Sequence, residues 1–282
     1  MKAFSAWLDQ GTEAISEPSP ALAAGIILTS GPSSVELFMV RRAPRLRFFG
    51  GSWAFPGGKV DDSDGGSATL AADKQMFAAA RELFEECGVL IARDADGLFP
   101  ISGPGLIDKR RGLIEGRFSF GKVLRDLKLT LNSADFLPVG NLVTPPFTSL
   151  RFDSTFYLVQ MPPKQEAEVW PGELDEGKWI QPAVLIDDWM RGQCLIAPPT
   201  LALLQTMRNR PVSEWPGRLT VLMSDWISKP LPPIFFAPEV QLLPLRTQAL
   251  PPSTHTNAYL IGRDPAYLLD PGPTDPEEQE KL

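Results

Sequence analysis

Histidine and cysteine are scarce in this sequence, and each scarcity excludes a class of site. A single histidine, His255, occurs in 282 residues, so the chain cannot build a site that needs several histidines. The two cysteines, Cys87 and Cys194, make no Cys-x-x-Cys pair. That argues against a disulfide framework and a thiolate zinc site, and it favours a reducing compartment. We therefore expect a cytoplasmic protein.

Long apolar runs and an excess of positive charge are also missing. No run of 18 or more apolar residues occurs, so no membrane span or membrane partner is expected. The N-terminal stretch MKAFSAWLDQ lacks the apolar core of a signal peptide. The net charge of −7 argues against nucleic acid as a partner, because the overall field would repel it. An anionic ligand would need metal ions or a few arginines.

Apolar spacing and turn residues predict a mixture of helices and strands. One helix carries apolar residues at a spacing of three to four and ends at Gly88. The other expected strands lie at 23–30, 34–42, 142–146, 154–162 and before Trp179, and the other expected helices at 106–116, 120–131, 182 onward and 198–209. Beyond about residue 230 the composition becomes proline-rich, which is typical of a linker.

The stretch AAARELFEECGV places three glutamates on one and a half helical turns. Glu82, Glu85 and Glu86 are spaced i, i+3 and i+4, so their carboxylates lie on one side of the helix. One interpretation is a solvated helical face with an Arg81–Glu85 ion pair. The other is a cation site, because Mg²⁺ and Mn²⁺ prefer oxygen ligands and would turn repulsion between carboxylates into coordination.

The segments FPGGKVDDSD and RELFEECGV together resemble the Nudix box. That motif reads Gly, five residues, Glu, seven residues, then Arg-Glu-apolar-x-Glu-Glu-x-Gly-apolar. Gly58 matches the first glycine, and residues 81–89 match every specified position of the second half. Asp64 stands where the motif has Glu, and sixteen residues rather than seven separate it from Arg81. We expect the nine extra residues to form a loop or an extra helical turn.

Flanking segments resemble the coenzyme A diphosphatase branch of the Nudix hydrolases. Its signature precedes the box and is matched here by Arg42, Leu46, Arg47, Gly51 and residues 55–58. Phe49 replaces a histidine of that signature, and Ser52 replaces a glutamine. The segment LVTPPFTSLRFDSTFYLVQMP resembles a further element of the branch, with Ser154 in place of a threonine. The resemblance covers about residues 20–210.

The family's fold is an α/β/α sandwich around a mixed sheet. The resemblance therefore implies an α/β Nudix domain over residues 1–230, with a helical insertion at about 90–135. Residues 231–282 would hold a proline-rich linker and a short C-terminal β extension.

The resemblance also implies Mg²⁺- or Mn²⁺-dependent hydrolysis of a diphosphate bond in a nucleoside diphosphate derivative. The best guess for the substrate is coenzyme A or acyl-coenzyme A, which water would split into two phosphorylated halves. The implied metal ligands are the Gly58 carbonyl, Glu82, Glu85 and Glu86. Glu82 would act as base or water-mediated ligand, Glu85 belongs to the catalytic set, and Arg81 would hold the glutamates in place.

Arginines and acids outside the helix complete the implied site. The expected substrate-binding residues are Arg42, Arg45, Arg47 and Arg151, and the expected further ligands or bases are Asp64, Glu173, Asp175 and Glu176. Solvated loops are the alternative for these segments, and an Arg151–Asp153 structural pair is another. Aromatic residues Phe48, Phe49 and Trp53 would line an adenine or pantetheine site, or belong to the core.

The C-terminal segment has a resemblance of its own. HTNAYLIG and AYLLDPG read as a strand pair similar to the opening strands of a metallo-β-lactamase-fold hydrolase, but that fold's histidine-rich zinc motif does not follow. The chain is then a fragment of a longer fusion or carries a vestigial extension, and we expect residues 236–282 to pack weakly. His255 would be a strand or loop residue. The alternative function is a non-catalytic nucleotide-sensing module attached to such a hydrolase. Homodimer formation stays open, because the sequence shows no interface signal.

Overall fold

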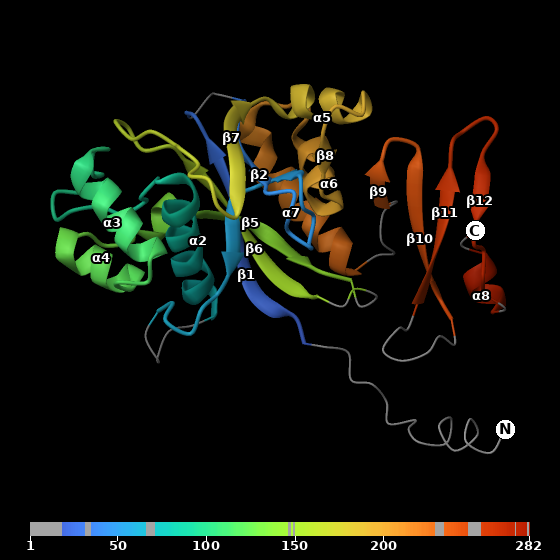
Figure 1. The fold of residues 1–282 in the computed structure, drawn as a ribbon, viewed down its shortest axis with the longest axis horizontal. Helices are drawn as coiled ribbons and strands as arrows, with labels where there is room; N and C mark the ends of the chain where they lie inside the picture. Colours follow the sequence, from blue (N-terminus) through green and yellow to red (C-terminus); the bar gives the residue numbers. More distant parts are fainter. Residues whose placement is uncertain are drawn as a thin grey trace, which may run out of the picture.

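A mixed β-sheet lies between two layers of helices in the computed structural model (Figure 1). The structure describes residues 19–31, 35–65, 71–145, 148, 150–228, 234–247, 255–273, 275–280 and 282. The helices on one side are α2–α4, and those on the other side are α5–α7 (Figure 1). This arrangement confirms the predicted α/β/α sandwich. None of the helices in these ranges is long and apolar enough to cross a membrane.

Strand β1 (Ala21–Thr29) organises the sheet. It runs parallel to β6 (Phe152–Gln160) along its whole length. It pairs with β4 (Gly57–Lys59) near its start and meets β2 (Leu37–Arg42) at its end. The remaining strands are β3 (Ser52–Ala54), β5 (Leu137–Val143), β7 (Leu174–Ile180) and β8 (Leu195–Ile196). The strand order β5-β6-β1-β2-β3-β8 has β4 and β7 attached to β1 and β2, which brings the glycine-rich β4 beside the centre of the sheet.

Side chains alternate across β1 and fill two separate cores. Ala24, Ile26 and Leu28 pack beneath α2 (Ala71–Cys87), whereas Ile27 faces the opposite helical layer. That second layer consists of α5 (Pro182–Met190), α6 (Pro198–Met207) and α7 (Trp215–Ser228). Burial on both faces explains why β1 reads as a continuous apolar run. Cys87 is fully buried in the first core, as expected of a small core residue.

The expected elements occur with shifted ends. The insertion forms α3 (Pro104–Ile114) and α4 (Phe120–Leu127), followed by short 3₁₀ turns at Ser133–Asp135 and, later, Val212–Glu214. Helix α4 stops four residues before the expected end because Lys128 adopts a left-handed backbone conformation with φ 56°. Ten of the sixteen residues between Asp64 and Arg81 belong to α2, which begins at Ala71, and residues 66–70 lie outside the described ranges. Helix α7 was not predicted.

The described residues beyond 233 form strands where the sequence predicted a linker. Residues 229–233 lie outside the described ranges, but the following segment forms β9 (Ile234–Ala237) and β10 (Val240–Arg246). They join β11 (His255–Ile261) and β12 (Tyr267–Leu269) in a four-stranded antiparallel sheet, and α8 (Pro276–Gln279) follows (Figure 1). This segment is rich in proline, yet it keeps enough apolar residues in register for a sheet. β12 is exposed along its length, as expected of a weakly packed extension, whereas Leu245 and Ala258 are fully buried.

Candidate active site

Backbone pairing with β1 fixes the glycine-rich segment Gly57–Gly58 beside α2. The Ile26 amide donates to the Pro56 carbonyl at 2.8 Å, and Gly57 and Gly58 pair with Gly25 and Ala24 of β1. Gly57 has a φ of 147°, and a Cβ there would overlap the Ala24 carbonyl. A residue other than glycine would therefore push the loop off the sheet. This close approach sets Gly57 and Gly58 against the glutamates of α2.

Arg81 is the buried centre of the polar network. It donates from Nε and Nη2 to the two carboxylate oxygens of Asp64 at 2.8 and 2.9 Å, and from Nη2 to the Lys59 carbonyl at 2.8 Å. Its Nη1 donates to Glu82 at 3.0 Å and to Glu85 at 3.4 Å. Burial alone would lower the pKa of Arg81, but the hydrogen bond to Asp64 and the surrounding negative charges outweigh it and raise that pKa.

Asp64 holds Arg81 in place. It is fully buried, and both its oxygens accept from the guanidinium in a bidentate pair. The lengthened α2 therefore does not separate it from Arg81, despite the longer spacing in the sequence. As arranged here, Asp64 positions the glutamates through Arg81 and offers no free oxygen of its own to a ligand.

The three glutamates lie close together and are partly buried. Burial raises the pKa of Glu82 to about 7, and it also raises the pKa of Glu85. Glu86 accepts from the Gly57 amide at 2.9 Å, yet burial and the nearby charge of Glu82 raise its pKa well above the usual range. A Cβ at Gly58 would overlap the Glu82 carboxylate, so loop and helix are in direct contact.

The carboxylates are occupied by internal donors in this structure. Within the described ranges, no three histidine, cysteine, aspartate or glutamate side chains are grouped so that they could hold a metal ion as they stand. Even so, Glu82, Glu85 and Glu86 supply hard oxygen donors on one helix, and burial, together with nearby negative charge, raises their pKa values. A divalent cation compensates such charge, so the residues fit Mg²⁺ or Mn²⁺. The ligand set with the Gly58 carbonyl stays a prediction.

A cavity of about 510 Å³ opens beside this network. Glu82, Glu86 and the Gly57–Gly58 loop form its polar end. Most of its remaining lining is apolar and comes from elements far apart in the sequence, including Phe48, Phe49, Leu142, Phe152, Phe156, Trp226, Phe236 and Leu242. Such a cavity suits a ligand with a charged group at one end and a larger apolar or aromatic part.

Only one of the four predicted substrate arginines is among the described residues lining the cavity. Arg42 lies in its wall, where it donates to the Phe48 carbonyl and pairs with Glu173 at 3.2 Å. Arg45 and Arg47 are exposed, and Arg45 donates to the Gly172 carbonyl. Arg151 donates to the Thr144 carbonyl at 3.2 Å. The structure thus brings Arg42 to the polar end of the cavity and leaves the other three outside its lining.

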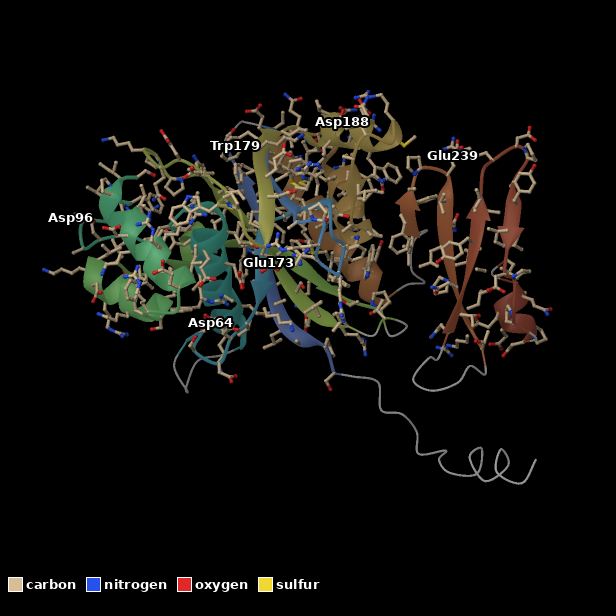
Figure 2. All side chains as sticks on the ribbon, viewed as in Figure 1. Asp64, Asp96, Glu173, Trp179, Asp188 and Glu239 are labelled. Atoms are coloured by element: carbon tan, nitrogen blue, oxygen red, sulfur yellow. The ribbon has the colours of Figure 1, made fainter. Side chains whose placement is uncertain are left out.

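The predicted acids divide in the same way. Glu173 lines the cavity near the centre of the sheet, whereas Asp64 binds Arg81 and is not among the lining residues (Figure 2). Asp175 and Glu176 pair with Arg41 at 2.8 and 3.1 Å and lie outside the cavity lining. Of the predicted extra ligands or bases, Glu173 is therefore the one that a molecule in the cavity could contact.

The predicted aromatic residues also divide between cavity and core. Trp53 is buried in the second core, with the Lys178 ammonium 4.4 Å from its ring centroid. Phe48 and Phe49 line the cavity. Trp53 is therefore a core residue, whereas Phe48 and Phe49 are cavity residues.

Arg110 of α3 belongs to the site, although the sequence did not single it out. This buried side chain donates from Nε to the Glu85 carbonyl at 3.0 Å and from Nη2 to the Glu86 carbonyl at 2.8 Å. Carbonyls in the last turn of a helix have no partner within it, and positive charge is favourable there. Burial lowers the pKa of Arg110, and the ring of Trp170 lies 4.1 Å from its guanidinium carbon. No sequence spacing links position 110 to position 85, so only the packing of α3 on α2 reveals this contact.

Comparisons with known proteins show what this chain is similar to. Residues 19–103 match the family model described as "NUDIX domain". The curated Caenorhabditis elegans protein "Putative nudix hydrolase 7" is 27% identical over 193 residues, a stretch that covers 68% of this chain and 61% of that protein. The crystal structure of a NUDIX hydrolase from Alicyclobacillus acidocaldarius is 26% identical, with a TM-score of 0.62, and the similarity covers 72% of this chain and 97% of that one. The match thus spans about three fifths of the curated relative's length.

Proposed function

We propose, from the premise that residues 19–103 form a Nudix domain, that this chain is a hydrolase acting on an acid anhydride. Its reaction is the hydrolysis of a diphosphate bond in a nucleoside diphosphate derivative. The oxygen of water bonds to one phosphorus, the bridging P–O bond breaks, and two phosphorylated halves leave with release of a proton.

One observation carries this proposal. Glu82 and Glu86, two of three glutamates on one helix, face the Gly57–Gly58 loop at the polar end of a cavity of about 510 Å³. Mg²⁺ or Mn²⁺ bound there would supply charge compensation for the diphosphate and a more acidic bound water. The ligands would be Glu82, Glu85, Glu86 and the Gly58 carbonyl.

The chain's own residues orient the reactants. Arg81, held by Asp64, fixes the side chains of Glu82 and Glu85. Arg110 fixes the helix end that carries Glu85 and Glu86. Arg42 offers a guanidinium at the same end of the cavity for a phosphate oxygen, provided that it leaves Glu173. Glu82 would serve as base toward an attacking water, and Glu173 is a further carboxylate in the lining.

Coenzyme A or acyl-coenzyme A is the substrate that we propose within this class. The support is the sequence signature around Arg42 and Arg47 and the long apolar part of the cavity. Phe49 takes the place of the signature histidine in that lining. The active metal is proposed to be Mg²⁺ or Mn²⁺, and the location cytoplasmic.

A nucleotide-sensing module without turnover is the alternative. Its support is the C-terminal sheet, whose strands β11 and β12 carry the resemblance to the opening of a metallo-β-lactamase-fold hydrolase. The complete set of glutamates favours the enzyme, because a module that only binds has no need for every ligand.

A mass-spectrometric turnover panel separates these proposals. The panel contains coenzyme A, acyl-coenzyme A, NADH, ADP-ribose and dinucleoside polyphosphates with Mg²⁺ or Mn²⁺. We expect release of 3′,5′-ADP from coenzyme A, and a loss of about 10²–10³-fold or more in Glu86→Gln, since that variant removes charge at the reacting centre. Glu280→Gln, at an exposed position outside the cavity lining, serves as the matched control and should retain full activity.

Other results of the panel are equally informative. Cleavage of a different substrate would keep the hydrolase and replace the coenzyme A assignment. Binding without turnover of any member would favour the sensing module, and equal activity of wild type and Glu86→Gln would contradict the assigned site.

A further inference from the structure

Two phenylalanine rings from different parts of the fold stack on each other in the cavity wall. Phe49 follows β2 in the Nudix domain, and Phe236 belongs to β9 of the C-terminal sheet. Their ring centroids are 6.3 Å apart and their planes differ by 27°. Both line the cavity that Glu82 and Glu86 also line. The C-terminal sheet therefore supplies part of the cavity wall.

Phe49 is held in an unfavourable backbone conformation. Its φ of 51° lies in the left-handed region, which is rare for a bulky residue and costs energy. Neighbouring rings support it: Phe48 packs edge-on against it with centroids 4.4 Å apart, and Phe48 in turn meets Phe152 at 6.0 Å. Such a conformation persists only where the surroundings fix it, and here it directs the ring toward Phe236.

The two rings form one aromatic surface in the cavity wall. Their centroid separation of 6.3 Å lies within the range of about 4.5–7 Å for rings in direct contact, so a planar group would stack on this surface. Strand β9, which carries Phe236, is an edge strand of its sheet. Phe236 is also 41% exposed, so a stacked ligand would cover apolar surface that is now open to water.

We propose that the base of a nucleotide stacks on the aromatic surface formed by Phe49 and Phe236, so that the C-terminal sheet completes the nucleotide site. The proposal rests on the proposed function in one respect, namely that the diphosphate lies at the glutamate end of the same cavity. An aromatic base is the part of such a ligand that gains from stacking on these rings. The C-terminal sheet is then a determinant of substrate selection.

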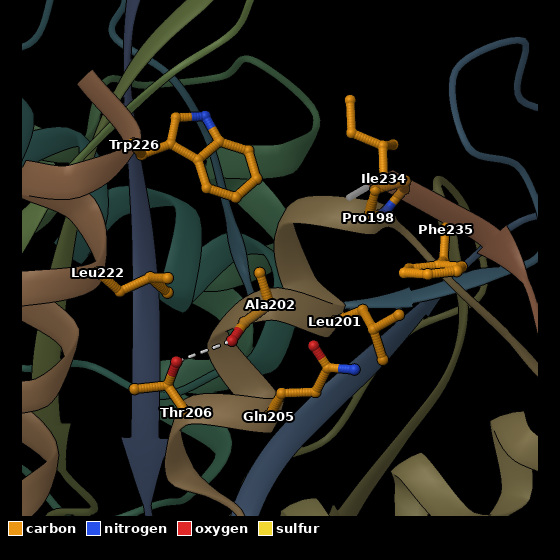
Figure 3. Close-up of a pocket in the computed structure, with 9 residues that line it drawn as sticks. All are labelled: Pro198, Leu201, Ala202, Gln205, Thr206, Leu222, Trp226, Ile234 and Phe235. Atoms are coloured by element: carbon orange, nitrogen blue, oxygen red, sulfur yellow. Dashed lines mark hydrogen bonds between the residues drawn. The ribbon is translucent and has the colours of Figure 1, made fainter. Parts of the chain in front are cut away.

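The residue before Phe236 on β9 provides a matched control. Successive side chains of a strand point to opposite faces. Phe235 accordingly lies beside Leu201 in a neighbouring pocket of about 320 Å³ between α6, α7 and β9, and it is not among the residues that line the larger cavity (Figure 3). The same substitution at 235 and at 236 thus changes one face of β9 or the other.

Binding of ADP and of ribose 5-diphosphate, which lacks the base, tests the proposal in the full chain with Mg²⁺. Calorimetry gives the dissociation constants, and mass spectrometry verifies that each ligand stays intact. We expect the wild type to bind ADP about tenfold more tightly than ribose 5-diphosphate, and Phe236→Leu to lose about tenfold for ADP alone. Phe236→Trp should retain the preference, and Phe235→Leu should leave it unchanged.

Two results would overturn the proposal. One is an equal loss of affinity for both ligands in Phe236→Leu, and the other is no loss for either. Thermal unfolding of each variant identifies a folding defect, and the retained preference of Phe236→Trp is a readout that such a defect cannot produce. A wild type that prefers ADP but hydrolyses nothing would leave this inference standing and remove the proposed activity.

Discussion

The two ends of the cavity are built in different ways. The polar end comes mainly from residues 57–86, where Arg81 joins Asp64, Glu82 and Glu85, and the Arg42–Glu173 pair adds to it. The aromatic end combines a loop after β2, strand β6 and strand β9, segments that lie up to about two hundred residues apart. The chemistry is therefore encoded locally, whereas the selection of the ligand depends on how distant parts of the chain pack together.

Removing the charge of Asp64 should cause the largest loss of stability at the polar end. Asp64→Asn leaves the buried Arg81 without its bidentate partner, and loss of one member of a buried pair costs about 3 kcal/mol or more in the free energy of unfolding. Urea titration with Mg²⁺ absent measures that loss. Asp61→Asn is the matched control, because Asp61 is 63% exposed and lies 3.7 Å from Arg81, so its loss should stay below about 1 kcal/mol. Equal losses in the two variants would contradict the assigned role of Asp64.

The sequence predicted the polar end because its motif specifies residues at fixed spacing on one helix. Glu82, Glu85, Glu86 and Gly58 lie where the pattern places them, at the junction of loop and helix. The sequence did not reveal that Asp64 reaches Arg81 across a longer α2, since the spacer length alone cannot distinguish a loop from added helical turns. It also could not reveal Arg110 or Phe236, because nothing local links them to the glutamates.

Removing Arg110 should give the next largest effect. Arg110→Gln loses the charged donor at the end of α2, and the activity should fall about 10–100-fold, the range for a residue that orients metal ligands. Because Arg110 acts through Glu85 and Glu86, the Mg²⁺ concentration needed for half-maximal activity should rise. Arg110→Lys should restore part of the loss.

Arg111→Gln is the control for that experiment. Arg111 is the next residue of α3, its side chain is 54% exposed, and it pairs with Asp108. A fall in activity at position 110 without any change in the Mg²⁺ requirement would mean that Arg110 contributes only to stability.

The pH dependence of stability should be a smaller effect that distinguishes the metal-free and metal-bound states. Burial raises the pKa of Glu82 to about 7, so between about pH 4.5 and 7 the folded state binds a proton that the unfolded chain has released. The metal-free protein should therefore lose stability as the pH rises through this window. Saturating Mg²⁺ should reduce or reverse the loss, and Glu82→Gln should reduce it, because the pKa values of Glu85 and Glu86 are raised as well. Urea midpoints at pH 5 and pH 8 provide the measurement, and a metal-free protein that gains stability over that interval would contradict it.

The central claim is that the glutamates of α2 exchange their internal partners for a divalent cation at the polar end of the cavity. Anomalous diffraction from crystals soaked in Mn²⁺, at a wavelength near the manganese absorption edge, tests this directly. We predict an anomalous peak bounded by Glu82, Glu85, Glu86 and the Gly58 carbonyl, which is lost in Glu86→Gln crystals soaked identically. A peak located elsewhere, or no peak in crystals of an enzyme that turns over its substrate with Mn²⁺, would contradict the claim.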